Sequence, residues 1–330
     1  MLHATFKATN GKLVALTIAA VAFLNNIALA QATTPTNEAP PSVVSNAIYP
    51  SLEQLMRPFP NPAWNQFPRS EHDVIQLAPG LYTFRFGLQA TRNIFMVTPH
   101  GVIVTDPMNA RAAAALRAEI RKITPLPVRY VVYSHSHWDH ISGGQIFKDE
   151  GAKFIAQRNC VANLTANKSN DVVMPDILYD RRYTLRLGGR TLELYHFEPD
   201  ASNCSTYMRP DGGDLMFVVD TVIPGRMPLG SMADTYPSGI VRTLQTLENM
   251  PIKAIIPGHG GPIADRSAMT ERRLYMEGLM RATREQLANP TPPLDLYKSI
   301  RVPEFSYLRG YEQDIDRNAE RMVNYFYIGW

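Results

Sequence analysis

Three histidines and one aspartate lie within six consecutive residues, in the run His135-Ser136-His137-Trp138-Asp139-His140. Imidazole nitrogens suit zinc, and carboxylate oxygens suit zinc or a harder cation. Residues 129–133 are β-branched and aromatic, which predicts a buried strand leading directly into this run. Burying so many polar groups together would be costly without a bound partner. The run therefore predicts a metal site, and not a set of unrelated core or surface histidines.

Strand geometry divides these side chains into two sets. In an extended segment, side chains two residues apart point the same way, so His135 and His137 can reach one ion together. Asp139 and His140 fall where we expect the strand to give way to a turn, which can direct them toward a second ion. One or two divalent ions are therefore expected, with Zn²⁺ first and Mn²⁺ or Fe²⁺ as alternatives.

The run resembles the His-x-His-x-Asp-His signature of the metallo-β-lactamase superfamily, and the resemblance extends over residues 74–265. Asp106, after an apolar run, is similar to the family's first acidic residue, which implies that it supports the ligands from behind. The apolar run ending in Asp220 is similar to the strand that ends in the family's bridging carboxylate. The run ending in Gly258-His259 is similar to the strand that supplies its last histidine.

The resemblance implies two metal shells joined by one carboxylate. His135 and His137 would hold the first ion, and Asp220 would bridge it to the second. The full set of predicted metal ligands is His135, His137, Asp139, His140, Asp220 and His259. The implied enzyme is a hydrolase in which a metal-bound hydroxide attacks an ester, lactone, amide or thioester. Asp139 would be both a ligand and the candidate catalytic acid or base.

One position departs from the family pattern. Aligned on Asp220, the further histidine that normally holds the first ion is replaced by Ala201. His196 lies five residues upstream, where an odd offset points to the opposite face of a strand and five residues cover ~16 Å. We therefore expect His196 to be a sheet residue packed under the loop. Asp200 or Cys204 as substitute ligands, or two histidines with water alone, remain open.

Three functions remain open at this point. The first is the metallo-hydrolase described above, and the second is a β-lactamase that hydrolyses β-lactam antibiotics. The third is a non-catalytic or accessory metal-binding protein on a degenerate hydrolase scaffold, for which Ala201 is the support. The retention of Asp139, Asp220 and His259 favours an enzyme. The chain has no Gly-rich nucleotide fingerprint and no Gly-x-Ser-x-Gly elbow.

The elements that must position these residues alternate in type. Short β-rich runs at residues 81–86, 93–97 and 101–105 precede a helix expected over 112–122. Later strands are expected at 153–156, 183–187, 191–197, 205–209, 215–219 and 253–256, and helices at 144–150, 242–250, 267–288 and 311–327. This alternation predicts an α/β fold with helices outside a sheet sandwich. The resemblance makes it the four-layer αββα sandwich, with residues 71–266 as the metallo-β-lactamase-like domain and 267–330 as a helical extension packed on it.

The amino-terminal segment is typical of a secretory signal peptide. Lys7 and Lys12 precede an apolar run over residues 13–30 that ends in Ala28-Leu29-Ala30. We expect cleavage after Ala30, a periplasmic or secreted product, and no stable membrane span afterwards; an uncleaved anchor is the alternative. Residues 31–70 are rich in Pro, Ser, Thr and Asn, which predicts an irregular arm.

Charge and the remaining residues add weaker expectations. The chain carries 33 basic and 30 acidic side chains without a basic block, so a small-molecule substrate is expected and nucleic acid is not. Cys160 and Cys204 could form a disulfide or stay free. Gly188-Gly189 predicts a hairpin turn. Trp138 is expected to wall the pocket or to pack in the core, and Asn318 and Arg321 to lie on a solvent-exposed helix face. The oligomeric state is left open.

Overall fold

The computed structural model describes residues 72–87, 90–167 and 171–329, all within one compact unit that comprises residues 37–330. The predicted signal peptide, residues 1–30, and the predicted arm, residues 31–70, lie outside the described residues. Among the described helices, none combines the length and the apolar character needed to cross a membrane.

A seven-stranded sheet forms the first half of the described chain, with its strands in sequence order. Its strands are β1 (His72–Ala78), β2 (Leu81–Phe86), β3 (Thr91–Thr98), β4 (Gly101–Thr105), β5 (Val128–Val132), β6 (Lys153–Gln157) and β7 (Ile177–Tyr179). Strands β1 to β4 pair antiparallel, whereas β4 to β7 pair parallel. The parallel pairs need crossovers, which contain α2 (Ala110–Ile123), α3 (Trp138–Ile141), α4 (Gln145–Asp149) and α5 (Cys160–Asn167).

A six-stranded sheet follows, in the order β13-β12-β11-β10-β9-β8. Its strands are β8 (Arg182–Leu187), β9 (Arg190–Tyr195), β10 (Tyr207–Pro210), β11 (Leu215–Val218), β12 (Ala254–Pro257) and β13 (Ala264–Asp265). Only β11 and β12 pair parallel, and helix α6 (Pro237–Glu248) connects them. Gly188 and Gly189 both have positive φ and form the predicted two-residue hairpin turn between β8 and β9.

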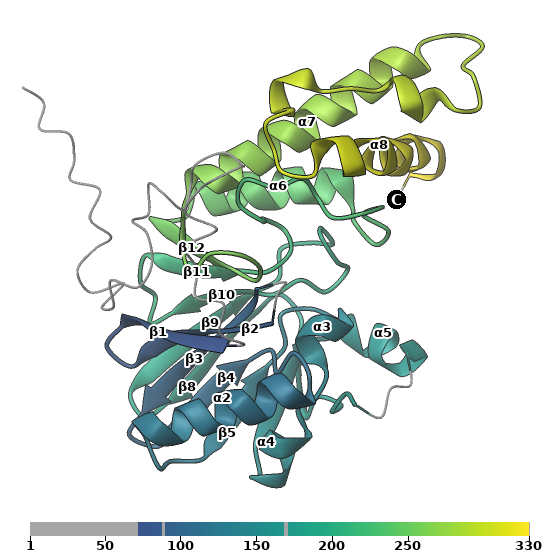
Figure 1. Cartoon of the computed structure of the whole chain (residues 1–330). Coiled ribbons are helices and arrows are strands. Elements are labelled where there is room, and N and C mark those ends of the chain that lie inside the picture. The colour runs from purple at the N-terminus through teal and green to yellow at the C-terminus, as the bar shows by residue number, and fades with distance from the viewer. Residues whose placement is uncertain (1–71, 88–89, 168–170, 330) are drawn as a thin grey trace, which may run out of the picture. The chain divides into compact units, whose positions relative to one another are not determined.

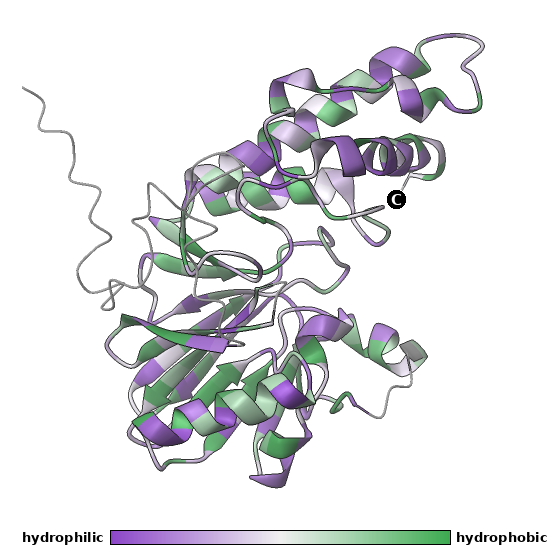
Figure 2. Cartoon of the chain, in the orientation of Figure 1, coloured by the Kyte–Doolittle hydropathy of each residue, from purple (hydrophilic) through white to green (hydrophobic). Residues whose placement is uncertain are grey.

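The two sheets pack face to face between two layers of helices (Figure 1). Helices α2 and α4 cover one sheet, whereas α6, α7 (Ser267–Leu287) and α8 (Tyr311–Ile328) cover the other. Figure 2 shows both hydrophilic and hydrophobic stretches on these covering helices, as expected for amphipathic elements. The arrangement confirms the predicted four-layer αββα sandwich.

Alternation along the strands divides the core into three parts. In β4, Ile103 packs between the sheets, whereas Val102 and Val104 pack under α2. In β11, Phe217 packs between the sheets and Met216 packs under the carboxyl-terminal helices. Both strands are therefore buried on both faces, which is why their sequences are continuously apolar.

Helix α6 begins five residues earlier than its apolar periodicity indicates. Pro237 occupies its first turn, a position that suits the fixed φ of proline. The start of the helix sits on the loop at residues 199–206, because the backbone N–H of Tyr236 donates to the carbonyl of Asp200 (2.6 Å). A Cβ added at Gly239 would lie 1.8 Å from the carbonyl oxygen of Pro199, so this joint leaves no room for a side chain.

The prediction that Asn318 and Arg321 face solvent is wrong. Asn318 is fully buried; its amide donates to the carbonyl of Gly230 (2.8 Å) and accepts from the hydroxyl of Tyr275 (2.9 Å). Arg321 is buried and donates to the carbonyl of Met232 (3.2 Å). Polar residues on a helix are ordinarily expected to face solvent, but they can be buried where a loop packs against the helix and offers its backbone carbonyls as partners. Here residues 228–235 pack against α8.

Candidate metal centre

His135 and His137 follow the carboxyl end of β5 and face one carboxylate oxygen. Nε2 of His135 lies 3.1 Å from Oδ2 of Asp220, and Nδ1 of His137 lies 3.0 Å from the same oxygen. His135 is buried, and the hydroxyl of Ser134 lies 2.8 Å from its other ring nitrogen. The predicted first set of ligands is therefore brought together around Asp220.

The second set gathers at the other oxygen of Asp220. Nε2 of His259 lies 3.1 Å from Oδ1 of Asp220 and 3.1 Å from Nε2 of His140. Oδ2 of Asp139 lies 3.6 Å from both of these imidazole nitrogens. Asp139 and His140 are carried by the short helix α3, where a turn was expected, and His259 follows β12. All six predicted ligands thus lie side by side.

The spacing of these atoms fits divalent cations. At zinc–ligand distances of about 2.0–2.2 Å, neighbouring ligand atoms of a tetrahedral site lie about 3.3 Å apart. Two groups of ligand atoms lie within 4.8 Å of one another: His135, His140 and Asp220, and Asp139, His140 and His259. Nε2 of His135 and Oδ1 of Asp220 are buried without a hydrogen-bond partner. A cation would satisfy both atoms, so the residues present fit the metal that the sequence predicts.

Strand topology explains the convergence. Strands β4 and β5 are parallel, as are β11 and β12, so each pair ends at one edge of its sheet. Asp220 follows β11 with φ of +58°, a left-handed conformation that aspartate tolerates better than most residues. Asp106 follows β4 and is fully buried, with one oxygen 3.4 Å from Nδ1 of His140 and the other accepting from the N–H of Ser134 (2.8 Å). It lies behind His140, where the resemblance places it.

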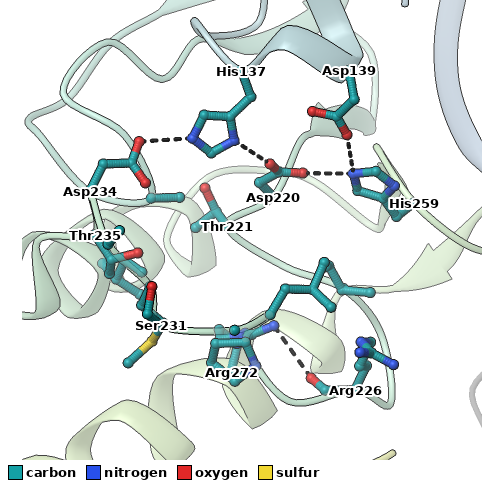
Figure 3. A pocket seen from close by; sticks show the side chains of 18 of the residues that line it. His137, Asp139, Asp220, Thr221, Arg226, Ser231, Asp234, Thr235, His259 and Arg272 are labelled. Carbon is teal, nitrogen blue, oxygen red and sulfur yellow. Dashed lines mark hydrogen bonds and ion pairs between the residues drawn. The ribbon is translucent and has the colours of Figure 1, made fainter. Parts of the chain in front are cut away.

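A pocket of about 710 Å³ opens beside the centre (Figure 3). His137, Asp139, Asp220 and His259 line one side, and residues 228–235 form much of the wall. Trp138 is 55% exposed and is not among the lining residues, so the expectation that it walls the pocket or packs in the core is wrong. The first turn of α3 directs Asp139 into the pocket and leaves Trp138 in solvent.

Residues 89–259 match the metallo-beta-lactamase superfamily. The chain belongs to this superfamily. Linear primary-alkylsulfatase from Pseudomonas sp. (strain ATCC 19151) is 20% identical over 296 residues, which cover 70% of this chain and 54% of that protein. This chain therefore spans about half the length of that relative.

Solved structures share the fold of this superfamily. The sec-alkylsulfatase Pisa1 from Pseudomonas sp. matches with a TM-score of 0.67 and 17% identity, over 78% of this chain and 50% of that one. A metallo-beta-lactamase from Pontibacter korlensis matches with a TM-score of 0.56 and 18% identity, over 62% of this chain and 99% of that one. At these identities, the likeness shows the fold alone.

None of the three residues considered as substitutes for the superfamily's missing histidine belongs to a potential ligand group in the described chain. Nδ1 of His196 lies 2.9 Å from the carbonyl oxygen of Ser205, just beyond the end of β9. Asp200 is fully buried and accepts from the hydroxyl of Tyr207 (2.6 Å). Cys204 forms a disulfide with Cys160, which decides between the two states that the sequence left open.

Sequence reasoning missed Asp234, which lies against His137 from the loop after β11. Its Oδ2 is 2.8 Å from Nε2 of His137, the ring nitrogen opposite the one that faces Asp220 (Figure 3). Asp234 is therefore placed to accept the Nε2–H of His137 and to hold Nδ1 toward the centre. An acidic residue in a loop is ordinarily solvated, so its sequence context gave no signal. The one available signal was Ala201, because loss of a ligand from the first ion suggests that another residue supports His137.

The carboxylates raise the proton affinity of two histidines. Burial alone lowers the pKa of His137, but hydrogen bonds and charges from Asp220 and Asp234 outweigh it and raise this pKa to about 10. Burial also lowers the pKa of His140, but Asp220 and Asp106 outweigh burial and raise this pKa well above its ordinary value. His135 differs, because burial and the charge of His137 lower its pKa. Protons and cations therefore compete for the same nitrogens.

Proposed function

We propose that this chain is a metal-dependent hydrolase that cleaves an ester, lactone, amide or thioester bond in a small molecule. The supporting observation is that ligands from three strand ends converge on Asp220 beside a pocket of about 710 Å³. His135, His137 and Asp220 would hold one ion, and Asp139, His140 and His259 would hold a second, shared through Asp220. Zinc is the proposed metal, because imidazole and carboxylate donors suit it.

The chain's own residues prepare the site for hydrolysis. A bound divalent cation supplies hydroxide at neutral pH, because it lowers the pKa of a coordinated water to about 7. Asp106 and Asp234 hold His140 and His137 in orientation. The side chain of Asp139 is 48% exposed and lines the pocket, so this carboxylate can both bind an ion and exchange a proton with bound substrate.

Sulfate ester hydrolysis is a second candidate. The alkylsulfatase relative supports it, as do the three arginines among the pocket-lining residues, Arg226, Arg272 and Arg309. The β-lactamase alternative has less support, because Ala201 replaces the superfamily's histidine and the likeness to metallo-β-lactamases extends to the fold alone. The accessory-protein alternative predicts less than one tightly bound ion per chain.

Export is part of the proposal. Its support is the signal-peptide pattern over residues 1–30 and the Cys160–Cys204 disulfide, because disulfides persist mainly in oxidising compartments. Fractionation of cells that produce the full chain, with sequencing of the mature amino terminus, tests this. Mature protein that begins at Gln31 outside the cytoplasm is expected, whereas an unprocessed cytoplasmic chain would refute export.

The enzymatic proposal is tested with purified protein reconstituted with zinc or manganese. The panel comprises a carboxylic ester, a lactone, an amide, a thioester, an alkyl sulfate and nitrocefin, with metal content measured in parallel. We expect one or two ions per chain and turnover that His140→Ala abolishes. His100→Ala is the matched control, because His100 is exposed and distant in sequence from the ligands. Full metal occupancy with no turnover across the panel would count against the enzyme.

A further inference from the structure

The pocket has two chemically different sides. Arg272 and Arg226 lie across it from His137, Asp220 and His259 (Figure 3). Arg226 belongs to the loop after β11, and Arg272 lies in the second turn of α7, outside the residues that match the superfamily. Neither arginine belongs to the set of ligands that the resemblance implies.

Among the residues that the structure describes, Arg272 is a buried cation without a carboxylate partner. It is 5% exposed, and its hydrogen bond goes to the backbone carbonyl of Arg226 (3.3 Å). Within the described part of the chain, no acidic oxygen lies within ion-pair distance of its guanidinium, and burial lowers its pKa to about 10, which leaves it charged at neutral pH. Burying an unpaired charge is costly, so such a group is usually matched by a ligand or a counterion.

Arg226 adds a second donor that is incompletely satisfied. One terminal nitrogen lies 3.6 Å from Oδ2 of Asp314, whereas its Nε is buried without a hydrogen-bond partner. Within the described residues, Asp314 thus offers one carboxylate to Arg226, and no carboxylate lies within ion-pair distance of Arg272. The excess of positive charge favours an anion on this side.

We propose that Arg272 and Arg226 form a binding site for an oxyanion, so that the substrate is an anionic small molecule, such as a sulfate ester or a carboxylate. This inference rests on the proposed function of the pocket and names its substrate class. A guanidinium presents parallel N–H donors that match the oxygens of sulfate or carboxylate. The anion then accepts from both side chains and gives Arg272 the counter-charge that it lacks among the described residues.

The test measures binding, so that it does not depend on turnover. Hexyl sulfate, hexanoate and hexanol are titrated calorimetrically into the metal-loaded protein. Wild type is expected to bind at least one of the two anions tenfold or more tightly than hexanol. Arg272→Met should remove about tenfold or more of that affinity, in line with the loss of one charge-assisted hydrogen bond, and should leave hexanol binding within twofold.

Arg281→Met is the matched control, because Arg281 lies on the same helix with its side chain 64% exposed and should leave all three affinities unchanged. If Arg272→Met does not fold, Arg226→Met is used with the same expectation.

Sulfate-only binding and carboxylate-only binding both support the site and identify the group. Equal affinity for anions and hexanol, or full anion affinity in folded Arg272→Met, overturns it. Arginine-dependent anion binding, together with no turnover of any compound in the hydrolysis panel, would count against the proposed hydrolase and leave this site standing.

Discussion

Asp220 is the residue on which both sets of ligands depend. Its two oxygens face different histidine pairs, and its left-handed backbone restricts what can replace it. Asparagine is the informative substitution, because it also tolerates this conformation and has the same shape. The carboxylate charge can therefore be removed with little change in the backbone.

Asp220→Asn is expected to lose at least one ion per chain. The amide presents an NH₂ group to one of the two imidazole pairs, where a cation would need an oxygen. Elemental analysis after dialysis measures the loss, and circular dichroism checks the fold. Asp214→Asn, at a half-buried acid paired with Lys253, serves as the control. Unchanged metal content in Asp220→Asn would contradict the bridging arrangement.

Asp234→Asn is expected to weaken binding of the ion at His137 by 10- to 100-fold, because a neutral amide oxygen accepts the Nε2–H of that imidazole more weakly than a carboxylate does. The other ion should be less affected, since Asp139, His140 and His259 make no contact with Asp234. Competition with a chromogenic chelator resolves the two affinities. Equal weakening of both ions would point to a general loss of structure.

The pKa values predict opposite pH responses for metal-free and metal-loaded protein. His137 has a folded pKa of about 10 against 6.5 unfolded, so its contribution to stability is complete below pH 6.5 and is lost as pH rises toward 10. Asp220 has a lowered pKa, so its contribution is present above 3.8 and is lost in acid. Because folding raises the pKa of His137 and His140 and lowers that of His135 alone, chelated protein should be most stable between about pH 4 and 6.5. Metal affinity should instead rise with pH, and thermal unfolding from pH 4 to 10 with and without zinc measures both trends.

At the scale of elements, the sequence predicts what alternation and turn residues dictate. β2 and β4 have the predicted bounds, because Gly and Pro flank short apolar runs there. Periodicity fails where a partner decides the outcome. The strand predicted to end at residue 197 ends at Tyr195, which puts His196 outside the sheet. Asn318 was misjudged because the loop it supports is distant in sequence.

Asn318→Ala is expected to destabilise the protein by about 1–3 kcal/mol, because it leaves the buried hydroxyl of Tyr275 and the carbonyl of Gly230 without a partner. Hydrogen exchange should also quicken in residues 228–235, which line the pocket. Denaturant unfolding gives the first quantity. Asn289→Ala, at an exposed asparagine, is the matched control. A loss of stability without faster exchange in residues 228–235 would show that Asn318 of α8 does not hold the pocket wall in place.

At the scale of the molecule, the site could be predicted in part. The six candidate ligands were recognised because a dense histidine run is rare and because the runs ending in Asp220 and His259 resemble those of the superfamily. Asp234 and Arg272 were not found, since a loop acid and a helix arginine are ordinary surface residues until the fold brings the first against His137 and buries the second. The pocket is assembled from both kinds of residue, so its metal side was predictable and its cationic side was not.

The Cys160–Cys204 disulfide closes a loop with a sequence separation of 44. The chain-entropy relation gives about 4 kcal/mol of stabilisation for such a loop. The double variant Cys160→Ser, Cys204→Ser should therefore unfold at lower denaturant concentration in oxidising buffer. Wild type with a reductant should approach the same midpoint. Identical midpoints for oxidised wild type and the double variant would show that the cross-link contributes no stability.

The joint at Gly239 has a consequence for changing what this pocket accepts. Ala201 and Ile240 line the pocket from either side of that joint, where the backbones of the loop and of α6 touch with no side chain between them. A larger side chain in the loop at Ala201 must therefore displace α6, which carries Ile240 on the other wall. Engineered variants with broader specificity should therefore arise from paired substitutions at positions 201 and 240, and insertions between them should reshape both walls at once.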